Sequence, residues 1–544
     1  MTASVVDAGD GLPLTIPALL RARVGERPDD VFLVCDDDVL TYGDAERRSA
    51  ALARGLLAAG ASKGTHVALL HPNGSRFAVA WLAAARIGAV AVPLSTFSTS
   101  AELATLLRNA DVHLLLSAAS YRNHDYVAAL REAVPDLDLA IPPPMLAPSA
   151  PVLRRIAFEG DEALPTGIHP TWTTVALVEQ GANIDAAVLR AAEDAVTSAD
   201  RMVIVHTSGS TSEPKGVVHA HGPLIRHLDN LNQLRRYTPD EVLFSNSPFF
   251  WIGGFAYVLL GTLVAGAKLV CSNATEPAAV LDVLERERPT MVNGFAQSVA
   301  HLPDDPSFAG RDLSSIRRGN LFPIMPAAVR PADPELRHTM LGMTEAGSVC
   351  LVSEDEGEQP EHRRGSFGRP APGLEARVVA EDGTECKPGE QGELHLRGPF
   401  LMEGYYGRER HETFHPDGWF ATGDLFTVDD DGFFYFGGRR GDMIKSAGAN
   451  VSPREVEAAI RDVAGLVAHV VGVDDEARGQ VVAAAVRVPD GRTVDADDLR
   501  AQLRARLSAY KVPRTIRLFA EDEVPTMSSG KLDLRALKDL LRAD

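Results

Sequence analysis

The chain has 544 residues, too many for a single hydrophobic core, so two or more domains are expected. Its formal net charge of −20 argues against nucleic acid as a partner and against docking on an anionic membrane, because no basic face is available for phosphate groups. The four cysteines lie far apart, without the spacing of a metal site or a disulfide framework. Together with an N-terminus that lacks a signal-peptide pattern, this predicts a cytoplasmic protein.

The first part of the chain predicts strands that alternate with helices. Thr41 and Asp44 form a capping-box-like start for a helix that ends near Gly60. Such an alternation is typical of a parallel sheet. The expected strands are 66–70, 89–92 and 112–116, and the expected helices are 77–86 and 100–109. Residues 135–151, with three consecutive prolines, form a connection.

One later segment, residues 251–267, is uncharged and mostly apolar. It is shorter than the roughly 20 residues of a membrane span and contains several glycines, so we expect a buried helix that leads into a strand. The alternation continues with strands 242–244, 268–271 and 290–292. Residues 365–436 change to short strands joined by Gly/Asp turns, which predicts a β-rich subdomain.

A last unit begins after Gly437-Gly438. It is expected to hold helices 453–461 and 496–507 and strands 467–473 and 481–488. We therefore predict an α/β protein with a large N-terminal domain, residues 1–437, of parallel-sheet βαβ subdomains plus the β-rich subdomain. A small, mobile α+β C-terminal domain, residues 438–544, follows it. Residues 439–442 are interpreted as an interdomain hinge.

The most informative stretch is the Ser/Thr/Gly loop from His206 to Gly216, which follows the apolar run 202–205. Hydroxyls, backbone N–H groups and Lys215 in such a loop suit a polyphosphate. It is not a Walker A loop, because Pro214 stands where that spacing requires glycine. Taken alone, the cluster is equally typical of a polar surface turn.

Four further clusters follow in order. Each is ambiguous alone: the first is typical of a helix start, the second of a turn aspartate, the third of a basic β-turn and the fourth of a solvated tail. A hydroxyl beside a carboxylate suits an α-phosphate with Mg²⁺, and a carboxylate behind a glycine turn suits a ribose. The clusters are Gly342-Met343-Thr344-Glu345, Gly418 to Asp424, Gly438 to Gly448, and Pro525 to Lys531.

In this order and with these separations, the five segments resemble the adenylate-forming superfamily, which includes acyl-CoA synthetases, nonribosomal-peptide adenylation domains and firefly luciferase. The resemblance runs from about Thr41 to the C-terminus. It implies a first step in which a carboxylate attacks the α-phosphate of ATP, releasing pyrophosphate and forming an acyl-adenylate.

The resemblance also implies roles for individual residues. Thr344 and Glu345 match the phosphate-binding and Mg²⁺-binding positions, with Glu345 as the metal ligand. Asp424 and Arg439 match the ribose contacts, and Lys531 matches the lysine that bridges the carboxylate and the α-phosphate. The family's loop around the β- and γ-phosphates is matched by Thr207, Ser208, Gly209, Ser210, Thr211 and Lys215.

In the second step that the resemblance implies, a thiol attacks the adenylate and AMP leaves, after the C-terminal domain has swung about a hinge. The hinge position matches Gly441, and glycine permits the necessary backbone change. Lys445 and Gly448 match the segment presented in the thioester-forming state. A glycine there lets a pantetheine arm pass close to the backbone, which favours CoA or a carrier-bound pantetheine.

The sequence departs from the family pattern at the nucleotide and acyl pockets. The aromatic residue that packs on adenine is Leu341 here, and the usual Gly-Gly-Ala segment reads Gly319-Asn320-Leu321. Trp251 stands in a segment where many relatives carry histidine, and it is equally typical of a core residue. The candidate pocket residues are Trp251, Phe255, Asn293, Phe295, Asn320, Leu321, Leu341 and Met343.

None of these pocket residues is charged, so a hydrophobic acid is favoured over an amino acid, whose ammonium needs a buried carboxylate. The leading hypothesis is therefore an AMP-forming acid–thiol ligase that uses ATP, Mg²⁺ and CoA. Three alternatives stay open: transfer of the adenylate to a separate carrier protein or an amine, a non-catalytic nucleotide-binding relative, and luciferase-like oxidation. A homodimer stays open as well.

Overall fold

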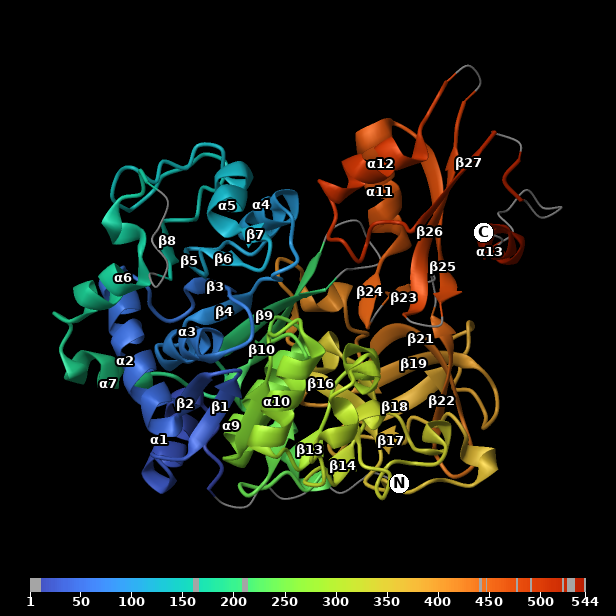
Figure 1. Ribbon diagram of the computed structural model, residues 1–544, viewed down its shortest axis with the longest axis horizontal. Coiled ribbons are helices and arrows are strands. Elements are labelled where there is room, and N and C mark those ends of the chain that lie inside the picture. The colour runs from blue at the N-terminus through green and yellow to red at the C-terminus, as the bar shows by residue number, and fades with distance from the viewer. Residues whose placement is uncertain are drawn as a thin grey trace.

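The computed structural model describes residues 11–159, 166–207, 214–439, 443–446, 448–475, 478–489, 492–520, 523–525 and 534–542. In Figure 1 the blue, green and yellow parts form one large body, and the orange-red C-terminal unit sits on one side of it. The predicted α/β architecture is confirmed, with parallel-sheet subdomains, a β-rich part and a separate C-terminal unit.

A seven-stranded sheet occupies the first subdomain, in the order β20-β10-β9-β4-β3-β5-β8. Five of its strands run parallel, as their near-continuous apolar sequences predict for a sheet covered on both faces. They are β3 (His66–Leu70), β4 (Val90–Pro93), β5 (Leu114–Ser117), β8 (Arg155–Phe158) and β9 (Arg201–Thr207).

The edge of this sheet differs from the predicted alternation. After the phosphate-loop segment the chain forms β10 (Lys215–Ala220), which runs antiparallel to β9. The distant β20 (Gly404–Tyr405) then pairs with β10. β9 and β10 therefore form a hairpin instead of being joined by a helical crossover, and β20 is the outermost strand at this edge.

Helices cover the sheet and connect its strands. The predicted helix starting at Thr41 is confirmed, since the Thr41 side chain caps it at the Asp44 N–H. The helices of this region are α1 (Ile16–Glu26), α2 (Tyr42–Ala58), α3 (Ser75–Arg86), α4 (Ser100–Asn109), α5 (Tyr126–Ala133), α6 (Thr174–Gly181), α7 (Ala186–Asp194) and α8 (His221–Leu234), and a small hairpin is formed by β6 (Ser120–Tyr121) and β7 (His124–Asp125).

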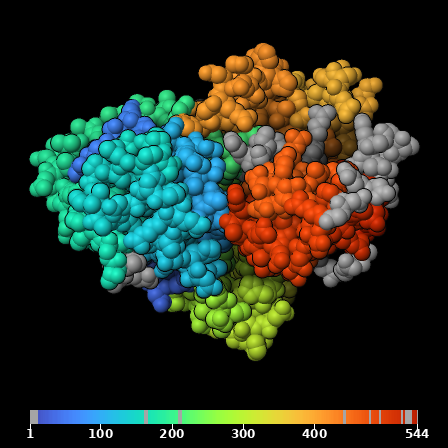
Figure 2. All heavy atoms as spheres, turned by 90° about the horizontal axis from the view of Figure 1, so that it is seen from above, coloured from blue at the N-terminus to red at the C-terminus, as the bar shows by residue number. Residues whose placement is uncertain are grey.

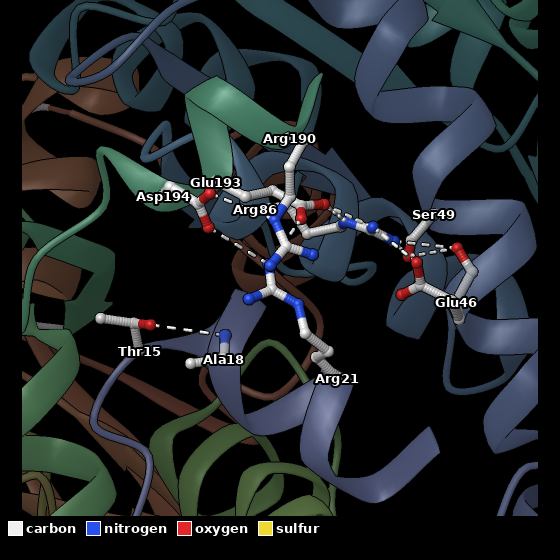
Figure 3. Close-up of polar contacts among 9 residues, drawn as sticks. All are labelled: Thr15, Ala18, Arg21, Glu46, Ser49, Arg86, Arg190, Glu193 and Asp194. Carbon is white, nitrogen blue, oxygen red and sulfur yellow. Dashed lines mark hydrogen bonds and ion pairs between the residues drawn. The ribbon is translucent and has the colours of Figure 1, made fainter. Parts of the chain in front are cut away.

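A buried arginine joins three of these helices (Figure 3). The guanidinium of Arg86, at the end of α3, lies between Glu193 of α7 and the carboxylate of Glu46 on α2. It also donates to the Ser49 hydroxyl at 2.9 Å. Arg21 of α1 reaches Glu193 at 3.0 Å, so four helices share one charged network.

A second sheet has six strands in the order β14-β13-β11-β12-β1-β2. They are β1 (Val31–Cys35), β2 (Asp38–Thr41), β11 (Val242–Phe244), β12 (Lys268–Cys271), β13 (Met291–Val292) and β14 (Arg318–Gly319), with α10 (Pro277–Glu287) beside them.

The apolar segment 251–267 forms a π-helix (Gly253–Leu260) that continues into α9 (Gly261–Ala265). Most of its side chains belong to the largest core cluster, which confirms a buried helix that leads into β12. Within the described residues, no helix has the length and apolar character needed to cross a membrane.

The β-rich part holds two small sheets, confirming the change of texture in the sequence. One sheet joins β15 (Leu341–Met343), β16 (Ser348–Val352) and β17 (Arg369–Pro370). The other joins β18 (Glu375–Val379), β19 (Gly392–Arg397), β21 (Phe420–Val428) and β22 (Phe434–Arg439). The boundary predicted after residue 437 falls inside β22, and the two-domain division at this residue stays a prediction.

The C-terminal unit packs its helices on a five-stranded sheet. Its long hairpin pairs β25 with β26 from Val467↔Arg487 to Asp475↔Gly479. The unit comprises β23 (Ile444–Ser446), β24 (Ala449–Val451), α11 (Pro453–Ala464), β25 (Val467–Asp475), β26 (Gly479–Arg487), α12 (Ala496–Arg504), β27 (Thr515–Phe519) and α13 (Leu534–Arg542).

Candidate active site

A cavity of about 830 Å³ lies where the large body meets the C-terminal unit. Residues from separate predicted clusters line it together, although the chain segments that carry them are far apart in sequence. The predicted site residues on its wall are Thr207, Lys215, Trp251, Asn293, Phe295, Asn320, Leu341, Met343, Thr344, Glu345, Asp424, Lys445 and Gly448.

The two ends of the predicted phosphate loop face each other across a β-hairpin. Thr207 ends β9, Lys215 begins β10, and the two residues are paired in the antiparallel register. The Lys215 ammonium lies 4.9 Å from the centre of the Tyr405 ring, within reach of a cation–π contact. Ser208, Gly209, Ser210 and Thr211 lie outside the described residues.

Thr344 and Glu345 form a one-turn 3₁₀-helix between β15 and β16. The buried ring of His219 donates from Nε2 to the Thr344 carbonyl oxygen at 2.7 Å. Burial lowers the pKa of His219 to about 4, although this hydrogen bond opposes the shift, so the ring is neutral at pH 7. The Tyr405 hydroxyl donates to Glu345 Oε1 at 2.9 Å and orients that carboxylate.

Asp424 lies within β21 rather than behind a simple turn. Gly423 has a φ of +78°, a conformation that favours glycine, and the pairing of β19 with β21 shifts register between Ala421 and Leu425, on either side of this glycine. The Gly423 N–H donates to Glu393 Oε1 at 2.8 Å, which fixes this bulge. The bulge therefore directs a carboxylate that is only 6 % exposed towards the cavity.

Arg439 is paired with Asp424 in the register of β21 and β22, so the two predicted ribose contacts are neighbours in the backbone. The Arg439 side chain lies outside the described residues, as do Gly441, the predicted hinge, and Lys531, the predicted bridging lysine.

Aromatic side chains form one wall of the cavity. Trp251 lies with its ring centre 6.2 Å from that of Phe295 and 6.4 Å from that of Tyr510, which belongs to the C-terminal unit. Phe250 completes this wall. Two predicted pocket residues are instead core residues: Phe255 packs edge-on against Trp81, and Leu321 is buried beneath the second sheet.

The C-terminal unit lines the cavity with Met443, Lys445 and residues 448–450. Gly448 has a φ of +83°, and a Cβ atom there would stand 2.7 Å from the Phe295 ring. Only glycine therefore allows this close approach. Lys445 lies on the same cavity wall, and its ammonium is 4.9 Å from the Phe436 ring centre.

Several wall residues escaped the sequence analysis. Tyr405, Glu393, Phe250 and Tyr510 line the cavity, and His219 supports it from behind. The aromatic run Tyr405-Tyr406 between glycines is a weak strand signal that could have placed Tyr405 at the sheet edge. Nothing local marks Tyr510, because its position depends on how the two units meet.

Comparison with known proteins agrees with this geometry. The model of the family described as "AMP-binding enzyme" matches residues 20–406, and that of the "AMP-binding enzyme C-terminal domain" matches residues 455–531. The chain belongs to the AMP-binding enzyme family.

Among similar members of this family is the putative acyl-CoA synthetase YngI of Bacillus subtilis, 30% identical over 541 residues and covering 96% of each chain. A feruloyl-CoA synthase of an Amycolatopsis species is 33% identical over 505 residues, covering 91% of this chain and 92% of the relative. Among solved structures, the amide bond synthetase McbA from Marinactinospora thermotolerans has a TM-score of 0.77 at 26% identity, covering 96% and 99% of the two chains. The prediction of an AMP-forming ligase of the acyl-CoA synthetase class is confirmed.

The AMP-binding enzyme site offers few protein ligands for a metal ion. Within the described part of the chain, no three His, Cys, Asp or Glu side chains gather into a metal-binding group. The carboxylate of Glu345 fits Mg²⁺ in the manner typical of this ion, which takes one or two carboxylates and completes its shell with substrate phosphates and water.

Proposed function

We propose that the protein activates a hydrophobic carboxylic acid with ATP and transfers the acyl group to CoA. The observation that carries this proposal is the single cavity that joins Thr207, Lys215, Glu345 and Asp424 to an aromatic wall and to Gly448. These features supply, side by side, places for a triphosphate, a ribose, an apolar acid and a thiol. The similarity to CoA ligases supports it.

In the first step a carboxylate oxygen of the acid bonds to the α-phosphorus of ATP, and the bond from that phosphorus to pyrophosphate breaks. Both reactants are anions, so the site must neutralise charge and hold them in line. Lys215 and the loop before it hold the leaving pyrophosphate, and the Thr344 hydroxyl faces the α-phosphate. Mg²⁺ held by Glu345 would neutralise phosphate charge, and Lys531 bridges the two reactants.

In the second step the thiol sulfur of CoA attacks the acyl carbon, the bond from that carbon to the AMP oxygen breaks, and the thiol proton leaves to solvent. Lys445 and Gly448 already line the cavity in the described orientation of the C-terminal unit. Because Gly448 has no side chain, its backbone lies against the Phe295 ring, and the two form the part of the cavity wall along which we place a narrow pantetheine arm.

The acid is proposed to be hydrophobic because Trp251, Phe295 and Met343 bring no charge to their part of the wall. An amino acid would leave its ammonium without a partner among these side chains, which is costly in a desolvated site. The flat rings of Trp251 and Phe250 give such an acid a large apolar contact area.

A second candidate is transfer of the same adenylate to an amine. The similarity to McbA, an amide bond synthetase, favours keeping it. Both candidates share the first step and differ only in the nucleophile.

The deciding experiment is ATP–pyrophosphate exchange across a panel of aliphatic, aryl and polycyclic acids, repeated with CoA while AMP and thioester are followed. We expect exchange with one class of apolar acid and CoA-dependent thioester. Exchange without thioester, together with amide formation when amines are added, would select the second candidate. No exchange with any acid would contradict both.

A further inference from the structure

At one end of the cavity, the C-terminal unit touches the large body at a polar seam. The seam is formed by Thr99, Glu102, Glu455, Arg506, Ser508 and Lys511, of which Glu102, Ser508 and Lys511 also line the cavity. The Lys511 ammonium donates to Glu102 Oε1 at 2.7 Å and to Glu455 Oε1 at 2.8 Å. The Ser508 hydroxyl donates to Glu102 Oε2 at 2.6 Å, and the Thr99 hydroxyl donates to the Arg506 carbonyl at 3.3 Å. Figure 2 shows this contact, where blue atoms near residue 100 meet the red C-terminal unit.

The charged centre of the seam is nearly closed to solvent. The side chains of Lys511, Glu102 and Glu455 are 9%, 13% and 12% exposed. Ion pairs at the protein surface contribute little, but a buried pair that loses one partner leaves a charge without compensation. Contacts in the seam therefore stabilise the relative placement of the two units much more than the many exposed ion pairs do.

The partners of Lys511 belong to different units. Glu455 is in the first turn of α11, within the C-terminal unit, whereas Glu102 is in the first turn of α4, in the large body. When the units separate, Lys511 keeps Glu455, so its ammonium is not left unpaired. Docking on Glu102 is therefore reversible at a modest free-energy cost, which a fixed structural salt bridge would not allow.

Glu102 presents a rigid acceptor. It forms a capping box with Thr99, in which each side chain bonds the other residue's backbone N–H. Burial acts to raise the pKa of the Glu102 carboxyl, but the Lys511 ammonium and the Ser508 hydroxyl outweigh it and hold the pKa below its usual range. In the docked state the Glu102 carboxylate is thus charged, and the capping box aims it at Lys511.

The seam is continuous with the cavity. Tyr510, next to Lys511, places its ring 6.4 Å from both the Trp251 and the Phe97 ring centres. In the same orientation Gly448 packs against Phe295 and Lys445 lines the cavity. The contact of Lys511 with Glu102 therefore coincides with the arrangement that we assign to thioester formation.

We propose that Lys511, held by Glu455 and docked on Glu102, is a positioning residue that holds the C-terminal unit in the orientation for the second step. This inference rests on the proposed function. Both Lys511 and Glu102 reach the cavity wall, and the role that we assign to them is to position the C-terminal unit rather than to take part in the chemical steps. The seam determines the fraction of enzyme molecules in which Gly448 and Lys445 are presented to the acyl-adenylate.

The test separates the two half-reactions in Glu102→Gln and Lys511→Met variants. Thioester formation from preformed acyl-adenylate and CoA is expected to fall about tenfold or more, because a charge-assisted hydrogen bond that stabilises docking is lost. Pyrophosphate exchange is expected to change less than about twofold, since adenylation uses another orientation. Lys511→Arg should restore part of the thioester rate.

Lys268→Met is the matched control. It removes a lysine that is 25% exposed, against 9% for Lys511, and that lies 2.6 Å from Glu287, but both residues of this pair lie inside the large body. It should leave both half-reactions unchanged. Equal losses in the two half-reactions for Glu102→Gln, or no loss of thioester formation in either seam variant, would overturn the proposal.

A second readout does not depend on activity. Thr99→Cys with Arg506→Cys places two thiols across the seam, where a short thiol cross-linker should join the units quickly. Adding Glu102→Gln should slow this cross-linking about tenfold, whereas Lys268→Met should not. Slowed cross-linking in a chain that shows no exchange with any acid would support the docking contact and contradict the proposed function. Unchanged cross-linking would overturn the docking contact.

Discussion

At the scale of single residues, Tyr405 links the predicted phosphate and metal positions. Its hydroxyl orients Glu345, and its ring lies beneath the Lys215 ammonium. Tyr405→Phe keeps the ring and removes only the hydrogen bond to a carboxylate, which is typically worth about 1.5–3 kcal/mol. We expect pyrophosphate exchange to fall about tenfold or more, with a higher requirement for Mg²⁺.

Tyr435→Phe is the control for this change, because the Tyr435 hydroxyl donates to Asp429 at 2.8 Å and neither residue is on the cavity wall. Exchange measured over a range of Mg²⁺ concentrations should be normal in this variant. Equal exchange in both variants would show that Glu345 does not need Tyr405.

For Lys531 we expect the opposite pattern to that of Lys511: its loss should impair adenylation and spare thioester formation. Its predicted role is to bridge the carboxylate and the α-phosphate, so Lys531→Ala should lower pyrophosphate exchange about 100-fold or more. Thioester formation from preformed acyl-adenylate should be spared, because the bridged anions have already reacted. Full exchange in Lys531→Ala would refute the assignment.

At the scale of elements, the network around Arg86 is expected to hold the helices α1, α2, α3 and α7 together. Arg86→Met keeps much of the volume but leaves Glu193, which is 7% exposed, without its main cation. Removing one partner of a buried ion pair typically costs about 3–5 kcal/mol. We expect urea unfolding to show a loss of this size.

The matched control for this loss is Arg190→Met, on the same α7. Arg190 pairs with Asp194 at 3.1 Å, but both side chains are more than half exposed. Its removal should cost less than about 1 kcal/mol. Similar losses for the two variants would show that burial does not determine the strength of this network.

At the scale of the whole molecule, local patterns predicted elements and long-range packing completed the site. The bounds of β3 and β12 follow from apolar runs, and the start of α2 follows from Thr41 and Asp44. The apolar composition of the segment 251–267 predicts a buried helix but not which side chain faces the core and which the cavity. Phe255 is a core residue and Trp251 a wall residue. Lys511 and Glu102 are separated by 409 positions, and no local pattern could pair them.

Four buried histidines make the stability of the whole molecule depend on pH. His71, His219, His221 and His227 are at most 2% exposed. Burial lowers the pKa of His71 to about 3 and that of the other three to about 4, against 6.5 in an unfolded chain. Between these values the unfolded chain binds more protons, so stability rises with pH and falls on acidification below 6.5.

Each of these histidines should cost about 1.4 kcal/mol per pH unit below 6.5. Together they would remove several kcal/mol by pH 5.5, a large part of a typical stability of about 5–15 kcal/mol. We expect the first urea-unfolding transition to move to much lower urea between pH 7.5 and pH 5.5. His227→Gln removes one titrating ring, whose Nε2 donates to the Val349 carbonyl at 3.0 Å, and should flatten this pH dependence even if it lowers stability at pH 7.5. Equal slopes in the variant and the parent protein would show that these rings do not drive the acid sensitivity.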